Sequence, residues 1–90
     1  MAYADFQIEA PEARLTADAS AEELYHMGLV YSNGTEVPAD YVAAHKWFNL
    51  AAARGHLDAR ICREEMADMM GPAEIRKALR AARKWMAKAN

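Results

Sequence analysis

The residues best suited to chemistry in this chain are three histidines and one cysteine: His26, His45, His56 and Cys62. Imidazole and thiolate groups together could bind zinc or form a nucleophile with its base. The short motifs that mark such sites bring these residues together on one helix or turn, as in H-E-x-x-H or C-x-x-C. None of these residues has that spacing, and the histidines fall in different predicted helices or junctions. We therefore expect no enzyme activity, no metal site and no cofactor, and interpret Cys62 as a small hydrophobe.

The amino-acid composition limits the possible fold classes and the possible classes of binding partner. The chain has 90 residues, enough for one small domain. Alanine accounts for 21 of them, whereas valine and isoleucine together contribute 6, which favours closely packed helices over a sheet. The net charge of −2 indicates neither nucleic acid nor an anionic membrane as partner. Residues 1–45 carry eight acids and one base, and residues 46–90 carry ten bases and five acids, so the two ends of a stacked fold should differ in charge.

The expected location follows from the cysteine count and the N-terminus. Cys62 has no second cysteine to pair with, which favours a reducing compartment. Asp5 and Glu9 lie where a secretory signal would have a basic start and an apolar run. No stretch reaches the roughly 18 apolar residues that cross a bilayer. We expect a cytoplasmic protein with no membrane partner.

Hydrophobic periodicity predicts two helices in the first half of the domain. Ser20 and Glu23 form an S-x-x-E capping box, and the helix that it opens should close at residues 32–34. The second helix is expected to carry Pro38 in its first turn and to end at Gly55.

Two more helices are predicted, from about residue 57 to 70 and from Pro72 almost to the C-terminus. Each of the four helices has an apolar stripe that should be buried. The stripes are Leu24, Met27, Gly28 and Tyr31; Tyr41, Ala44, Trp47, Phe48, Leu50, Ala51 and Ala52; Ala59, Cys62, Met66, Met69 and Met70; and Ile75, Ala78, Leu79, Ala82, Trp85 and Met86.

An offset of 38 residues aligns the first pair of helices with the second, placing Gly28 on Met66 and Trp47 on Trp85. One offset that fits both helices indicates two copies of a helical hairpin, the unit of an α-solenoid. Gly28 opposite Ala44 should let the first two helices approach closely. Since Met66 is larger than Gly28, the second pair should sit further apart.

The fold class expected is therefore all-α, a short α-solenoid of two helical hairpins. Residues 1–18 form an N-terminal arm and residues 19–90 the helical-repeat domain. The clear repeat covers about 21–58 and the degenerate one about 59–90. Two hairpins leave the ends of a stack poorly covered. We expect residues 3–15 to fold back over an end through Phe6, Ile8 and Leu15, or else two chains to pair as a homodimer.

Many spaced residues between positions 21 and 59 match one repeat pattern. They are Met27, Gly28, Tyr31, Gly34, Val37, Pro38, Asp40, Ala44, Trp47, Phe48, Ala51, Ala52, Gly55 and Ala59. In this spacing the segment resembles the Sel-one-like repeat, a relative of the tetratricopeptide repeat. The resemblance implies an adaptor or scaffold that binds a protein or peptide, without catalytic residues in the repeat.

The resemblance also implies that the first helix of each hairpin lines the partner-facing side. The positions selected in this way, and by the 38-residue offset, are Glu22, Tyr25, Leu29, Arg60, Arg63 and Ala67. We expect them to bind the partner, with the two guanidinium groups holding carboxylates of an acidic peptide or a chain terminus. Alternatively, Arg60 and Arg63 pair along their own helix with Glu64 or Asp68.

The last predicted helix offers a different function. Its basic residues gather opposite its apolar stripe and are Arg76, Lys77, Arg80, Arg83, Lys84 and Lys88. Such a face could bind nucleic-acid phosphates, or it could be the solvated face of a terminal helix. Nucleic-acid binding is the alternative to protein binding.

Overall fold

The computed structural model describes residues 10–89, and these form four α-helices and one short 3₁₀ helix. The elements are η2 (Pro11–Arg14), α1 (Ala21–Asn33), α2 (Tyr41–Ala53), α3 (Leu57–Asp68) and α4 (Pro72–Ala89). No strand occurs in this part of the chain, and none of its helices is long and apolar enough to cross a membrane. The all-α prediction is confirmed.

The ends of α1 are those that the sequence predicts. The Ser20 side chain accepts a hydrogen bond from the Glu23 amide at 3.0 Å, and the Glu23 carboxylate accepts one from the Ser20 amide at 2.8 Å. The hydrogen bond from Ser20 lowers the pKa of the Glu23 carboxyl group. Gly34 ends the helix in the left-handed region, with φ 67°, and its amide donates to the Val30 carbonyl. Glycine adopts this conformation without the strain that a Cβ atom would add.

The start of α2 differs from the prediction. Pro38 precedes the helix instead of lying in its first turn, and Asp40 is the N-cap. The Asp40 carboxylate accepts a hydrogen bond from the Ala43 amide at 3.1 Å, while its own amide donates to the Tyr31 carbonyl. Capping by a carboxylate satisfies an amide that the helix leaves free. This local bond, not the proline, sets the start at Tyr41.

His56 caps α3, which ends at Asp68, two residues before the predicted end. Pro72 begins α4 as predicted, because its missing N–H leaves no helical bond unmade. The Glu74 carboxylate accepts a hydrogen bond from the Gly71 amide at 3.0 Å.

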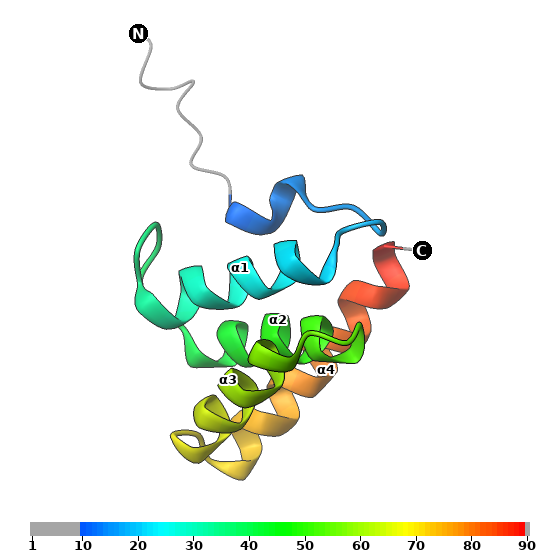
Figure 1. Cartoon of the computed structure of the whole chain (residues 1–90). Coiled ribbons are helices and arrows are strands. Elements are labelled where there is room, and N and C mark those ends of the chain that lie inside the picture. The colour runs from blue at the N-terminus through cyan, green and yellow to red at the C-terminus, as the bar shows by residue number, and fades with distance from the viewer. Residues whose placement is uncertain (1–9, 90) are drawn as a thin grey trace, which may run out of the picture.

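α2 is the central helix and packs against α1, α3 and α4 (Figure 1). η2 lies across α1 from α2 in this view (Figure 1). α3 and α4 make few close contacts with each other, although a short turn joins them. This agrees with the wide spacing expected from Met66, which lies at the position equivalent to Gly28.

The core lies around α2, where Trp47 and Phe48 are buried together with Leu24 of α1. Trp85 of α4 packs edge-on against Trp47, with ring centroids 5.3 Å apart. The nearest neighbour of Gly28 is the Phe48 ring, which occupies the space where a side chain would stand.

Three residues predicted to be buried are instead exposed: Tyr41 by 40%, Met69 by 54% and Met86 by 46%. Tyr41 is the first residue of α2, Met69 follows the last residue of α3, and Met86 lies in the last turn of α4. At helix ends neighbouring elements cover fewer faces, so a periodic pattern overestimates burial there.

Part of the predicted N-terminal arm packs on the first hairpin. Leu15 contacts the core, and the Tyr31 hydroxyl donates a hydrogen bond of 2.6 Å to the Glu12 carboxylate. Arg54 donates to the carbonyl oxygens of Ala17 and Ala19. These bonds hold residues 12–19 against α1 and the end of α2. Phe6 and Ile8 lie outside the described residues.

Candidate partner-binding surface

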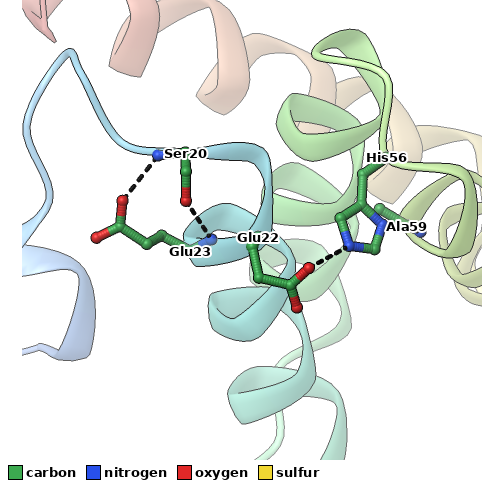
Figure 2. A network of polar contacts seen from close by, with 5 residues as sticks. All are labelled: Ser20, Glu22, Glu23, His56 and Ala59. Atoms are coloured by element: carbon green, nitrogen blue, oxygen red, sulfur yellow. Dashed lines mark hydrogen bonds and ion pairs between the residues drawn. The ribbon is translucent and has the colours of Figure 1, made fainter.

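His56 joins the two repeats through both nitrogens of its ring. Its Nδ1 accepts a hydrogen bond from the Ala59 amide at 3.1 Å, so this nitrogen carries no proton. Nε2 then carries the proton and donates to the Glu22 carboxylate of α1, also at 3.1 Å. Figure 2 shows Glu22 and His56 pointing towards each other from neighbouring segments. The ring caps α3 and fixes its start beside α1.

Tyr25 fills the space between the two repeats. Its ring stacks on His56, with centroids 4.2 Å apart and an interplanar angle of 24°, and lies 5.8 Å from the Phe48 ring. Burial raises the pKa of the Tyr25 hydroxyl, and the nearby Cys62 and Asp58 raise it further. Tyr25 therefore faces α3, and a half-buried aromatic surface remains at the junction of the repeats.

The two arginines of the predicted surface bind within the chain. Arg63 is half-buried and donates a hydrogen bond of 3.0 Å to the Asn49 side chain of α2. Arg60 pairs with Glu64 at 3.7 Å, and about two-thirds of each of these side chains is exposed. One of the two pairings expected from the alternative interpretation is thus present. Neither guanidinium group has its bond partner on α1.

The titratable groups of α3 that act on the Tyr25 hydroxyl are Asp58 and Cys62, which the offset did not select. The offset relates positions that point in the same direction in each repeat, such as Tyr25 and Arg63. Side chains that meet across two helices lie on opposite flanks of those helices. Asp58 and Cys62 could therefore have been identified by selecting the flank of α3 that faces α1, instead of Arg63, the repeat equivalent of Tyr25.

The surface formed by α1 and α3 carries more acids than bases. α1 has two acidic residues and no lysine or arginine, and α3 has four acids and two bases. Leu29 is half-buried against the core, and Ala67 is half-buried on α3.

Burial and the Glu65 carboxylate raise the pKa of the Cys62 thiol, so Cys62 is not activated as a nucleophile.

A cleft of about 670 Å³ lies between the N-terminal segment and α1. Its lining includes Leu15, Met27 and Val37 together with three carboxylates. These acids are Glu22, Glu23 and Glu36, and the charged or titratable groups beside them are Arg14 and His26. Glu22 both lines the cleft and contacts His56.

The histidines occupy separate environments. His26 is exposed on α1, whereas His45 is buried in α2 and His56 caps α3. Burial, and then the charge of Arg63, lowers the pKa of His45. Within residues 10–89, no three histidine, cysteine, aspartate or glutamate side chains gather in an arrangement that could hold a metal ion.

Comparison with known families gives one match, on both hairpins. A family model of the Sel1 repeat matches residues 24–56 and 65–90. The chain belongs to the Sel1 repeat family. Sel1 repeats generally mediate protein–protein interactions and are typically non-catalytic. No curated protein and no solved structure matches the chain.

Proposed function

We propose that this Sel1 repeat protein is a non-catalytic adaptor that binds a protein or peptide on the surface formed by α1 and α3. The observation that carries the proposal is the half-buried Tyr25, stacked on His56 where the two repeats meet. A planar aromatic ring contributes much contact area at a small cost in conformational entropy. Leu29 extends the apolar part of this surface along α1.

The charge of the surface favours a basic partner segment over the acidic one expected from Arg60 and Arg63. Both arginines already have acceptors in the chain, whereas Glu22 is 78% exposed apart from its contact with His56. Glu36 adds a carboxylate at the adjoining cleft. Complementary charge mainly increases the rate and specificity of association, so a lysine- or arginine-rich segment should be preferred.

The test compares two labelled peptides of equal length, one rich in lysine and one rich in glutamate, by fluorescence anisotropy. We expect the full chain to bind the basic peptide and Glu36→Lys to weaken that binding. Asp18→Lys is the matched control, since it makes the same charge change at an exposed position outside the cleft lining.

The arginines provide the opposing test. If the acidic peptide bound instead, and Arg60→Glu with Arg63→Glu abolished that binding, the basic-partner proposal would be wrong and the original expectation correct. Partner capture with the same variants, followed by mass spectrometry, would extend the comparison to natural proteins.

Nucleic-acid binding is the second candidate, because the exposed side of α4 is strongly basic. The helix has six basic residues and one acidic residue, a net charge of +5. Phosphate binding of this kind weakens steeply as salt displaces the released counterions. Strong, salt-sensitive binding of random-sequence duplex or single strands, lost on reversal of Arg80 and Lys84, would favour this candidate.

A further inference from the structure

α3 carries an exposed apolar strip on the side directed away from the core. Leu57 is 73% exposed and Ile61 is 56% exposed. Glu65 and Asp68 follow Ile61 at i+4 and i+7, which places them on the same side of the helix. Next to this strip, Arg60 and Glu64 are paired with each other. The outward side of α3 thus combines two aliphatic side chains with the carboxylates of Glu65 and Asp68, for which the structure of residues 10–89 gives no ion pair.

α4 carries the complementary combination. Leu79 is half-buried and Met86 is 46% exposed, and they are spaced i and i+7. Arg76 and Arg83 are exposed beside Leu79, at i−3 and i+4, and the exposed Arg80 lies at the outer edge of the same flank. No ion pair within residues 10–89 involves these arginines. An apolar strip beside acids on α3 therefore matches an apolar strip beside arginines on α4.

The two strips do not cover each other within one chain, since α3 and α4 make few close contacts. Their charges are opposite: α3 has a net charge of −2 and α4 of +5, from four acids against two bases and six bases against one acid. Exposed apolar side chains rimmed by charge are typical of interaction sites. The chain itself supplies the surface that would fit each strip.

We propose that the occupant of the α3 strip is α4 of a second copy of this chain. Leu79 and Met86 of one copy pack against Leu57 and Ile61 of the other. The arginines of α4 then face Glu65 and Asp68 of α3. The contact joins two different surfaces, so a two-fold dimer contains it twice and an open arrangement extends it from chain to chain. The proposal does not depend on the partner surface around Tyr25.

The test is sedimentation of the full chain over a concentration range up to about 1 mM, where weak association becomes measurable. Two variants reverse the charge on one side only: Glu65→Arg with Asp68→Arg on α3, and Arg80→Glu with Arg83→Glu on α4. The wild type should associate, and each variant alone should lose affinity by about tenfold or more. An equimolar mixture should recover association, because each variant then meets a complementary surface on the other.

The matched control is Lys77→Glu with Lys84→Glu, which makes the same charge change on the side of α4 turned away from Leu79 and Met86 and should weaken association much less than Arg80→Glu with Arg83→Glu. Leu57→Lys changes an exposed residue at the start of α3 and should weaken association without unfolding the chain. A wild type that stays monomeric over the whole range would overturn the proposal. So would unaltered association of the reversed variants, or a mixture that fails to associate.

Discussion

Gly28→Ala is the substitution that most directly tests how α1 packs on α2. A Cβ atom at this position would overlap the Phe48 ring, and that ring is only 1% exposed, so it cannot move into solvent. Alanine gains about 1 kcal/mol of helix propensity over glycine. Overpacking a filled core costs about 1–3 kcal/mol, and overlap with a buried ring places the cost near the upper end.

The expected net loss is about 2 kcal/mol, which lowers the Tm of a domain of this size by about 8–16 °C. Thermal and urea unfolding followed by circular dichroism measure it. Phe48→Leu provides a second background, in which the smaller side chain should reduce the cost of Gly28→Ala by about 1 kcal/mol or more. A Tm that rises in the single variant, or an equal cost in both backgrounds, would refute the packing argument.

Substitutions at three further positions test the core, the His56 contact and the buried His45. Trp47→Ala should cost about 3–5 kcal/mol and abolish cooperative urea unfolding, because Trp47 is fully buried at the centre of the fold; a retained sharp transition would contradict this. His56→Ala should lower stability by about 0.5–2 kcal/mol in chemical denaturation, whereas His56→Asn, which can still accept from the Ala59 amide, should lose less. Equal losses would show that the cap contributes nothing. Burial lowers the pKa of His45 below its ordinary value of 6.5. As the pH falls, His45 therefore takes up a proton in the unfolded state before it does so in the folded state, and the stability of the fold should decrease below about pH 6.5. His45→Leu should weaken this fall in urea titrations at several pH values, and an unchanged pH profile would rule out His45 as its source.

A helix boundary could be predicted from the sequence where capping side chains or a proline determine it locally. The pair Ser20 and Glu23 marks the start of α1 and Pro72 marks that of α4, because capping and a missing N–H act within a single turn. Pro38 was misleading, because Asp40 two residues later offers a better cap. The exposed Met86 shows the limit of periodicity, since the pattern identifies an apolar side chain but not what covers it.

The candidate surface was predictable on α1 and less so on α3. Tyr25 was identified from its position beside the buried stripe, and it does lie at the junction of the repeats. Its offset equivalent Arg63 bonds to Asn49, and Asp58 stands near Tyr25 instead. Which flanks of two helices meet depends on their relative rotation and crossing angle, and a one-dimensional repeat offset contains neither.

The binding role of the α1 and α3 surface is tested most directly by backbone amide NMR spectra of the labelled protein during titration with the lysine-rich peptide. The account predicts that amide shifts change around Tyr25 on α1 and around Asp58 at the start of α3, while those of α4 stay in place. Changes confined to α4, or none at saturating peptide, would contradict it.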